Sequence, residues 1–486
     1  SCSRVRRALL LGAAIGEKAC AEKMAKKNGT VARMLITDPS KIEKLRTLGM
    51  GSFGRVFLAR PAGGDTVFAL KSLQKGSVVE MQQQKNVILE RAVMAECQHP
   101  FIVELVASYQ DATRLYMGMP VVRGGEVAHR LADAVDEDDE PLGLPAAQGV
   151  FYTAAVAVGC AHIHSKGFLW RDLKPENVMI SANGYPKLVD FGLSKRLDIA
   201  GGKKAYTMCG TPEYIAPEIV KGSGHGPGAD WYALGCFLFE CLSGWTPYVR
   251  DDEYGLSIYR YVVKKPVEIP DGMSPDSPEW ELLSAMLEKD PAKRIGCLKG
   301  GVQDILDHKF MQSTVDVEAV CEGRAKAPWV PVPVEDPTDF SHLKPDEDYG
   351  DDEDEYEYED DGSFADWDTN SPLAAEEEEE VIVRSEEEIA KLRAQFEEFD
   401  VDGGGTVSGE ELKAVLSSMG VGFSDAALRA AIREVDDDNS GQLDFDEFVN
   451  MMDSLSSKEE MVALAAILKN GRDKGRGAVL GKQLSM

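Results

Sequence analysis

A polar segment followed by a short hairpin constrains the fold of this chain more than any other feature. Residues 170–177 read Trp-Arg-Asp-Leu-Lys-Pro-Glu-Asn, and residues 190–192 read Asp-Phe-Gly. The first segment holds a carboxylate, an ammonium and an amide, from Asp172, Lys174 and Asn177. The second begins with another carboxylate about one hairpin later. The pattern predicts a loop and a hairpin that present the polar side chains of one site.

A glycine-rich segment lies upstream, within residues 42–60. It reads Gly49-Met50-Gly51-Ser52-Phe53-Gly54, and the apolar residues around it alternate as in the strands of a hairpin. The same glycine spacing occurs in Rossmann dinucleotide sites, where a helix follows. Here the residues after Gly54 read as a strand, and Val-Phe-Ala-Leu-Lys follows at 67–71. These two features reject the Rossmann alternative.

Lys71 ends this apolar strand. A lysine is usually a solvated surface residue, but its apolar frame here places an ammonium at the edge of a buried cleft, where it requires an anion. We expect a helix over residues 79–97, on which Glu90 lies among apolar residues. Glu90 is the best candidate for the partner of Lys71, and an exposed helix carboxylate is the alternative.

Further motifs follow in order, and together they carry a family resemblance. They are Leu173-Lys174-Pro175-Glu176-Asn177, Cys209-Gly210-Thr211-Pro212-Glu213-Tyr214, Asp230-Trp231 and Gly296-Cys297-Leu298-Lys299. The chain resembles Ser/Thr protein kinases of the group that contains the cyclic-nucleotide-dependent kinases. Trp170 stands where that group usually has Tyr. The resemblance implies an α+β two-lobed protein kinase fold over residues 41–310, which uses ATP and Mg²⁺.

The resemblance also implies roles for individual residues. The expected catalytic residues are Asp172, Lys174, Lys71, Glu90 and Thr211. The expected Mg²⁺ ligands are Asn177 and Asp190. The expected ATP-binding residues are Gly49, Gly51, Ser52, Phe53, Gly54, Val56, Ala69, Lys71, Met119 as gatekeeper, Pro120, Val122 and Glu126. Glu218 and Arg294 are expected to form a buried pair, and Asp230 to brace the catalytic loop.

The resemblance also predicts part of the regulation and of the substrate preference. Thr207 matches the phosphorylated threonine of the group's activation loop, to be modified by an upstream kinase or by autophosphorylation; an unmodified loop residue is the alternative. The resemblance implies that Glu126, Glu176 and Glu240 bind the basic residues of the substrate that precede the phosphorylated Ser or Thr. We therefore expect protein substrates with basic residues at those positions, although carboxylates are commonly just solvated.

Residues 311–384 are expected to form a kinase tail and an acidic linker. The net charge of the chain is −30, and much of it lies in the acidic tract between residues 345 and 388, so nucleic acid is not an expected partner. Such composition cannot bury enough apolar surface to order itself. Pro328-Trp329-Val330-Pro331 resembles the tail that wraps the kinase lobes. Phe364-Ala365-Asp366-Trp367 is either a degenerate hydrophobic motif docking on the small lobe or part of a solvated linker.

Residues 385–455 read as a pair of EF-hands, which predicts an all-α EF-hand domain. Calcium loops need oxygen ligands at positions 1, 3, 5, 7, 9 and 12, with glycine at 6. The second loop fits fully, with ligands Asp436, Asp438, Ser440, the Gln442 carbonyl, Asp444 and Glu447. The first loop offers Asp400, Asp402, the Thr406 carbonyl, Ser408 and Glu411, but Gly404 supplies no side chain at position 5. We expect the first loop to bind Ca²⁺ more weakly. Val407 and Leu443 suit the short strand that joins paired hands.

Both ends of the chain leave alternatives open. Residues 456–486 form a basic amphipathic segment that could occupy the calcium sensor's groove, lie on the acidic linker or lie on a membrane surface. Residues 1–40 form an N-terminal extension, which could be a short amphipathic helix packing on the kinase, a fragment of something longer or a crude secretory signal. The sequence shows no run of roughly 20 apolar residues. Its scattered cysteines fit a reducing, cytoplasmic compartment.

These features predict a calcium-regulated Ser/Thr protein kinase. A pseudokinase that acts as a calcium-responsive scaffold is one alternative, but it would normally lack one of the catalytic residues, and all are present. A pure calcium buffer is another, but it would need no ATP site. Plant-type calcium-dependent kinases combine the same two functions and are only an analogue, because they usually carry four EF-hands on a different kinase subgroup.

Overall fold

The structure is a computed structural model that divides the chain into two compact units near residue 375. It describes residues 41–51, 53–137, 140–248, 257–270, 272–332, 358, 362–365, 367, 393–394, 396, 399–400, 404–418, 442–445 and 448.

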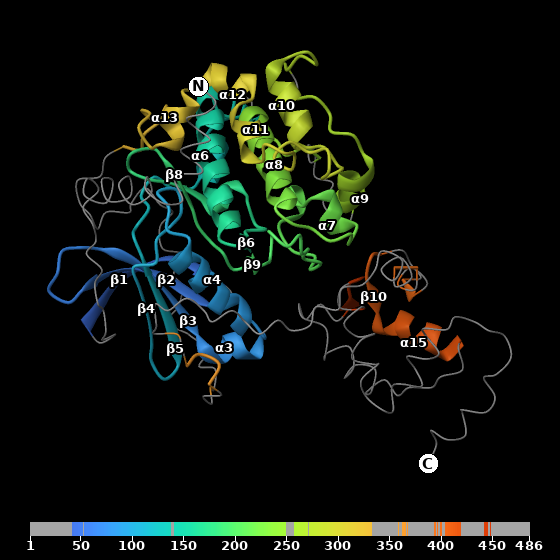
Figure 1. Ribbon diagram of the computed structural model, residues 1–486. Coiled ribbons are helices and arrows are strands. Elements are labelled where there is room, and N and C mark those ends of the chain that lie inside the picture. Colours follow the sequence, from blue (N-terminus) through green and yellow to red (C-terminus); the bar gives the residue numbers. More distant parts are fainter. Residues whose placement is uncertain are drawn as a thin grey trace. The chain divides into compact units, whose positions relative to one another are not determined.

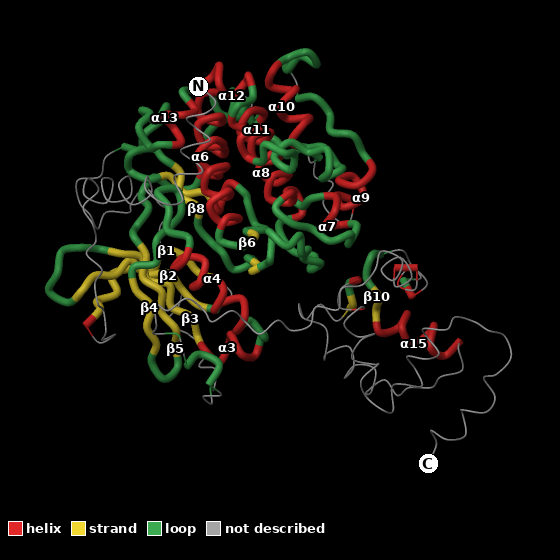
Figure 2. Tube along the Cα trace, viewed as in Figure 1, coloured by secondary structure: helices red, strands yellow, loops and turns green. Residues whose placement is uncertain are grey.

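The first unit begins with a small lobe built on an antiparallel sheet (Figures 1 and 2). Its strands are β1 (Ile42–Gly51), β2 (Gly54–Pro61), β3 (Phe68–Gln74), β4 (Ala107–Gln110) and β5 (Arg114–Met119), in the order β1-β2-β3-β5-β4. One face buries a cluster of apolar and aromatic side chains: Phe57, Ala59, Phe68, Leu70, Tyr109 and Tyr116. Alternate residues of a strand share a face, so the pattern of β3 places Lys71 opposite this cluster.

Two helices connect β3 to β4. They are α3 (Lys75–Glu80) and α4 (Gln84–Glu96). The sequence predicted one helix over residues 79–97, and this boundary was wrong, because the chain breaks between the two helices. Gln82 has a left-handed backbone with φ of 54°, which an α-helix cannot contain. Glu90 and Arg91 lie on consecutive positions of α4 and are both buried.

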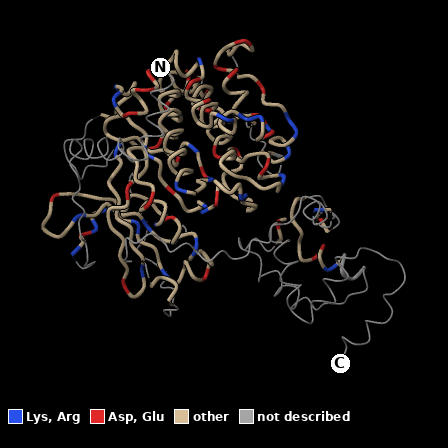
Figure 3. Tube along the Cα trace, in the orientation of Figure 1, with Lys and Arg blue, Asp and Glu red and all other residues tan. Residues whose placement is uncertain are grey.

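The larger lobe is mostly helical. Its helices are α5 (Val127–Ala132), α6 (Ala146–Ser165), α7 (Pro217–Val220), α8 (Gly228–Ser243), α9 (Ser257–Lys264), α10 (Pro278–Met286), α11 (Val302–Leu306), α12 (Lys309–Thr314) and α13 (Val317–Cys321). Helices α6 and α8 pack against each other in its core and are largely uncharged, as Figure 3 shows. A helix that is apolar on every side must be buried. The predicted pair is present: Arg294 donates to Glu218 at 2.6 and 2.8 Å, in the lobe interior.

Within the described residues, α6 is the one helix whose length and hydropathy would allow it to span a membrane. Most of its residues are buried inside the larger lobe. It therefore reads as a core helix.

Short elements between the helices carry the polar loop. Strand β6 (Phe168–Leu169) pairs with β9 (Lys195–Arg196), and β7 (Val178–Ile180) pairs with β8 (Pro186–Leu188). Two 3-10 turns, η3 (Pro175–Asn177) and η4 (Pro212–Tyr214), complete this region. The hairpin of β7 and β8 returns the chain from Asn177 to Asp190, as the sequence pattern predicted.

The tail packs on both lobes of the first unit. On the larger lobe, the Arg130 guanidinium lies 4.5 Å from the ring centre of Trp329. On the small lobe, Phe364 and Trp367 are each 2% exposed. Gln110 Nε2 donates to the carbonyl of Phe364 at 2.8 Å. Of the two interpretations of this motif, the structure supports docking on the small lobe.

In the described part of the second unit, β10 (Val407–Ser408) pairs antiparallel with β11 (Gln442–Leu443). Val407 lies opposite Leu443, which confirms the predicted strand between the two loops. Helix α15 (Gly409–Ser418) follows β10. The interior includes four buried apolar side chains that come from both loops and their flanks: Phe396, Phe399, Leu412 and Phe448.

Candidate active site

Lys71 and Glu90 join the sheet to α4 in the small lobe. The ammonium of Lys71 lies 2.6 and 2.8 Å from the two carboxylate oxygens of Glu90. Burial opposes the charge on Lys71, but the nearby carboxylates of Glu90 and Asp190 outweigh it and raise the pKa of the lysine. The ammonium is therefore charged at neutral pH and available to an anion in the cleft.

The glycine-rich segment and the neighbouring strands form the wall beside Lys71. Gly49 and Gly51 lie on β1, and Gly54 begins β2. A Cβ on Gly54 would lie 1.9 Å from the carbonyl oxygen of Ser72, so only glycine fits there. In the sheet register, Val56 pairs with Lys71 and Ala69 with Met119.

The remaining predicted ATP-site positions lie around this wall. Phe53 occupies the turn between β1 and β2, and Pro120 and Val122 follow β5. Ser52 lies outside the described residues. The five predicted residues on β2, β3 and the end of β5 lie on one face of the sheet: Gly54, Val56, Ala69, Lys71 and Met119.

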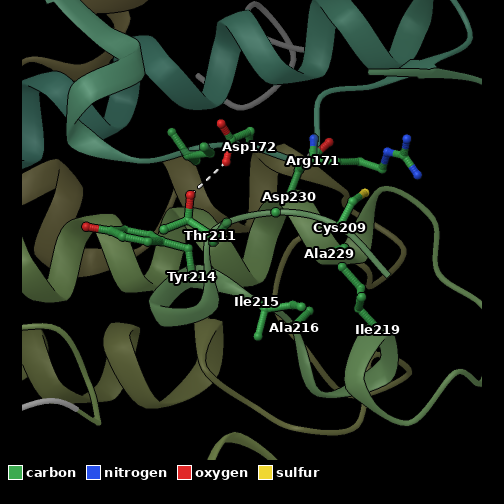
Figure 4. Close-up of a pocket in the computed structure, with 13 residues that line it drawn as sticks. Arg171, Asp172, Cys209, Thr211, Tyr214, Ile215, Ala216, Ile219, Ala229 and Asp230 are labelled. Carbon is green, nitrogen blue, oxygen red and sulfur yellow. Dashed lines mark hydrogen bonds between the residues drawn. The ribbon is translucent and has the colours of Figure 1, made fainter. Parts of the chain in front are cut away.

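The polar loop of the larger lobe forms a closed hydrogen-bonded set. Asn177 Nδ2 donates to the carbonyl oxygen and to Oδ2 of Asp172, both at 2.8 Å. The Thr211 hydroxyl donates to Asp172 Oδ1 at 2.9 Å, and it accepts a bond of 2.9 Å from Lys174 Nζ. Figure 4 shows the bond between Asp172 and Thr211 in the pocket that both residues line. The structure thus brings together four side chains that the sequence predicted to act at one site.

Asp230 anchors the backbone of this loop, as predicted. Its Oδ2 accepts from the Trp170 amide at 3.0 Å and lies 2.7 Å from His164 Nε2, and its Oδ1 accepts from the Arg171 amide at 2.8 Å. Burial alone would raise the pKa of this carboxyl, but the bonds from His164 and the two amides outweigh burial and lower it. The ionised Asp230 holds Arg171 in a left-handed conformation, with φ of 69°.

Carboxylates gather beside the loop on the side of α5 and α8. Glu126 immediately precedes α5, and burial together with the charge of Glu176 raises its pKa, although His129 opposes the shift. Burial, with repulsion from Glu176 and Glu213, raises the pKa of Glu240 to about 7. Electrostatic coupling therefore links the three acidic positions that the sequence singled out.

Tyr214 is a residue of this region that the sequence reasoning missed. Its hydroxyl donates to Glu240 Oε2 and opposes the upward shift of that carboxyl. Tyr214 ends the Cys-Gly-Thr-Pro-Glu-Tyr motif, so the motif was noted but its tyrosine was not given a role. Only the fold shows that the hydroxyl reaches an acid on α8.

The activation segment contains Thr207, which is exposed. Arg171, on the polar loop, donates from Nε to the carbonyl of Leu193 at 2.7 Å. Its Nη1 is buried and makes no hydrogen bond to any described residue. A buried guanidinium N–H of this kind can donate a hydrogen bond to an anionic partner.

The described part of the first calcium loop, residues 400 and 404–411, is held together by hydrogen bonds that its carboxylates accept. Asp400 accepts hydrogen bonds of 2.8 Å from the amides of Gly404 and Gly405, and Gly405 has φ of 84°, as the sharp turn at loop position 6 requires. Glu411 accepts from the amide and hydroxyl of Ser408 at 2.9 and 2.7 Å. These oxygen donors suit a hard cation.

The second calcium loop is described only in part. Gln442 lies on β11, and Asp444 follows that strand. Four of its predicted ligands, together with one from the first loop, lie outside the described residues: Asp402, Asp436, Asp438, Ser440 and Glu447.

Comparison with known families agrees with this geometry. The protein kinase domain family matches residues 42–311, and the EF-hand domain pair family matches residues 389–453. The chain belongs to the protein kinase family. The predicted two-lobed kinase fold with an EF-hand domain is thereby confirmed. ATP and Mg²⁺ are the nucleotide and metal of such a domain, and Ca²⁺ is the ligand of an EF-hand pair.

Similar kinases come from animals and beyond. The human cAMP-dependent protein kinase catalytic subunit PRKX is 36% identical over 289 residues, which cover 60% of this chain and 76% of that protein. A Caenorhabditis elegans cAMP-dependent protein kinase, catalytic subunit-like, is 37% identical over 292 residues, covering 60% and 69%. Human ribosomal protein S6 kinase alpha-1 is 37% identical over 298 residues, covering 60% of this chain but only 38% of that protein. The chain is a Ser/Thr protein kinase.

Proposed function

We propose that this kinase phosphorylates Ser or Thr in proteins that carry basic residues before the acceptor, and that Ca²⁺ bound to the EF-hand pair adjusts its activity. The kinase activity in this proposal is supported by the ion pair of Lys71 with Glu90 and by the hydrogen bonds around Asp172. A chain that had lost phosphotransfer would have no reason to retain both. The pseudokinase alternative is therefore disfavoured.

The roles proposed for the residues follow from their chemistry. Asp172 accepts the proton of the acceptor hydroxyl as its oxygen attacks the γ-phosphorus and the bond from that phosphorus to the β-phosphate oxygen breaks. Lys174 neutralises the charge of the transferring phosphoryl group. Thr211 forms hydrogen bonds with both Lys174 and Asp172 and so fixes their relative positions. Lys71 binds phosphate oxygens. Asn177 and Asp190 would hold Mg²⁺, which supplies positive charge where negative charge develops.

The substrate preference is supported by the acidic positions near this loop. An arginine guanidinium binds a carboxylate through paired hydrogen bonds, and Glu126, Glu176 and Glu240 offer three carboxylates close enough to influence one another. Peptides with Arg two and three residues before Ser are the expected substrates. Glu176→Ala should erode the preference, because Glu176 couples to both of the others.

The proposal of calcium regulation is supported by the sequence of both loops and by the hydrogen bonds that Asp400 and Glu411 accept within the described part of the first loop. Binding to paired EF-hands reorganises their helix ends and exposes apolar surface, and a tenfold change in kinase activity needs only about 1.4 kcal/mol of coupling. We further propose phosphorylation of Thr207, by another kinase or by autophosphorylation, and a cytoplasmic location. The segments 1–40, 311–384 and 456–486 are proposed to flank the kinase and EF-hand domains.

Phosphate transfer from radiolabelled ATP to a synthetic peptide tests these proposals. The full chain is assayed with an Arg-Arg-containing Ser peptide and with the same peptide in which both Arg are Glu, each in calcium and in chelator. Preference for the Arg peptide and a difference between calcium and chelator are expected. Selection of acidic peptides would refute the substrate proposal, and identical activity in both solutions would refute calcium regulation. No transfer to any peptide would leave the scaffold alternative.

A further inference from the structure

Three cations lie on the aromatic face of the small-lobe sheet, opposite Lys71. Because alternate residues of a strand share a face, Arg55 lies on the same face as Phe57 of β2. By the same rule, Arg114 shares this face with Tyr116 of β5. Lys44 joins them from β1, with its Nζ 4.3 Å from the ring centre of Phe57. Lys44, Arg55 and Arg114 are called the cationic face below.

The three cations are close enough to repel one another. Burial lowers the pKa of Lys44, and the charges of Arg114 and Arg55 lower it further, while Asp111 opposes the shift. The Asp111 carboxylate already accepts hydrogen bonds from the Tyr116 hydroxyl, at 2.8 Å, and from two backbone amides. Positive groups therefore outnumber negative ones around Lys44. A segment rich in carboxylates would relieve this repulsion.

The tail reaches the edge of the cationic face just before its docked segment. The ring centre of Tyr358 lies 5.2 Å from Lys75 Nζ, and this ammonium donates to the carbonyl of Asp111 at 2.8 Å. The ring centres of Tyr358 and Phe364 are 6.3 Å apart. All four residues line one pocket between the tail and the turn that joins β4 to β5. Tyr358 thus marks the point where the tail meets the turn that borders the cationic face.

The residues that precede Tyr358 are almost all acidic. Residues 351–357 contain six carboxylates and neither Lys nor Arg, and they lie outside the described residues. An extended chain covers about 3.3 Å per residue, so this segment can span roughly 23 Å. From β5 to β1 the sheet is three strand spacings wide, or about 14 Å. The acidic segment is therefore long enough to reach all three cations.

We propose that the cationic face binds the acidic segment 351–357 of the same chain, and that this electrostatic contact helps to hold the Phe364–Trp367 segment on the small lobe. Because the two segments are covalently joined, binding of one raises the effective concentration of the other at its site. The inference goes beyond the proposed function, since phosphoryl transfer makes no use of this face. It gives the tail an attachment that salt weakens, in addition to the burial of Phe364 and Trp367.

Hydrogen exchange of the full chain tests this attachment, read from the amides of residues 362–367. In the wild type, exchange should become about tenfold faster between low and high salt, as the loss of three exposed ion pairs would make it. A tail variant leaves the folded lobe untouched and neutralises the acidic segment: Asp351→Asn, Asp352→Asn, Glu353→Gln, Asp354→Asn, Glu355→Gln and Glu357→Gln. It should exchange rapidly at both salt concentrations. Exchange in the wild type that ignores salt, or slow exchange in the tail variant at low salt, would overturn the proposal.

A second pair of variants tests the cationic face itself. The face variant reverses its three charges: Lys44→Glu, Arg55→Glu and Arg114→Glu. The control variant makes the same change in net charge at three exposed cations of the larger lobe: Lys293→Glu, Lys309→Glu and Arg324→Glu. At low salt the face variant should exchange as fast as the tail variant, and the control variant as slowly as the wild type. A face variant no faster than the control variant would refute the assignment of this surface.

Charge reversal on both sides separates attraction from damage to the sheet. When all six carboxylates of the acidic segment are replaced by Lys in the face variant, slow exchange at low salt should return. Continued rapid exchange would contradict the pairing of the two segments.

A labelled peptide of residues 351–357 identifies the occupant of the face. Measured by fluorescence anisotropy at low salt, it should bind the tail variant at least about tenfold more tightly than the wild type, whose own segment competes at high effective concentration. Equal binding to both proteins would show a face open to an acidic partner protein and would overturn the intramolecular proposal. Absence of binding to the tail variant would also overturn it.

Discussion

Trp367 lies with its indole Nε1 2.9 Å from the carbonyl oxygen of Tyr109, on the small-lobe sheet. Arg91 Nη1 donates to the carbonyl of Trp367 at 3.0 Å, and the Arg91 guanidinium lies 5.5 Å from the indole ring centre. Arg91 follows Glu90 on α4. The docked tail is therefore joined to the helix that supplies the partner of Lys71.

Trp367→Ala should loosen α4 and raise the KM for ATP. Truncating a buried Trp costs about 3–5 kcal/mol, more than the remaining contacts of a short docked segment can offset, so the segment should dissociate. Hydrogen exchange of the α4 amides measures the loosening. Val332→Ala, at a tail side chain that is 85% exposed, serves as the control and should change neither quantity. Unaltered exchange in α4 on loss of Trp367 would contradict the coupling.

Lys71→Met and Asp190→Ala should each lower kcat by at least about a hundredfold, with Asp190→Ala leaving the fold largely intact. Removal of preorganised charge at the phosphates costs on the order of 3 kcal/mol in the barrier. Steady-state kinetics and a circular dichroism melt measure the two effects. Lys293→Met, at a lysine whose side chain is 72% exposed, provides a matched loss of charge without loss of activity. Turnover at the wild-type rate in Asp190→Ala would remove it from the metal site.

The KM for an Arg-containing peptide should rise as the pH falls from 8 to 6. Burial raises the pKa of Glu240 to about 7, so below this pH the carboxyl is protonated and must ionise before it can pair with a substrate arginine. One pH unit below the pKa, KM should be about tenfold higher. Glu240→Gln should flatten this dependence, and a wild-type profile as flat as that of the variant would contradict the assignment.

The contribution of Glu240 to folding stability should change with pH in the opposite direction to its contribution to substrate binding. Between the ordinary carboxyl pKa and about 7, the folded state holds the Glu240 proton and the unfolded state does not. The contribution of Glu240 to the free energy of unfolding therefore falls as pH rises through this window. Glu240→Gln should remove that fall, as denaturant titrations at pH 5 and pH 8 would show.

Glu447→Gln should abolish the tighter calcium site, whereas Glu411→Gln should remove only the weaker one. Each change replaces a bidentate carboxylate with a neutral amide, and the first loop lacks a side-chain ligand at position 5. Calcium titration of the full chain by calorimetry measures both sites. Equal affinities in the wild type, or loss of the tighter site on mutation of Glu411, would reverse the proposed order.

Much of this protein could be predicted from local chemistry. The order of the motifs indicated a two-lobed kinase, and Glu90 was predicted as the partner of Lys71, a contact that the structure contains. Asp172 and Asn177 were predicted to act at one site, where the structure brings them into hydrogen-bonding contact. The pairing of Val407 with Leu443 was also predicted, because loop position 8 of each hand carries an apolar residue. These features depend on residue type and short spacing, which determine backbone turns, strand faces and ligand positions directly.

Other features were decided only by the tertiary structure. The sequence left the Phe364–Trp367 segment open between docking and solvation, because its partners Arg91 and Tyr109 lie in a distant part of the chain. It also could not show that Glu240 accepts a hydrogen bond from Tyr214, or that the indole of Trp170 reaches the peptide of Asp190. Burial and hydrogen bonding across long sequence separations depend on how whole elements pack, and no local pattern records that packing.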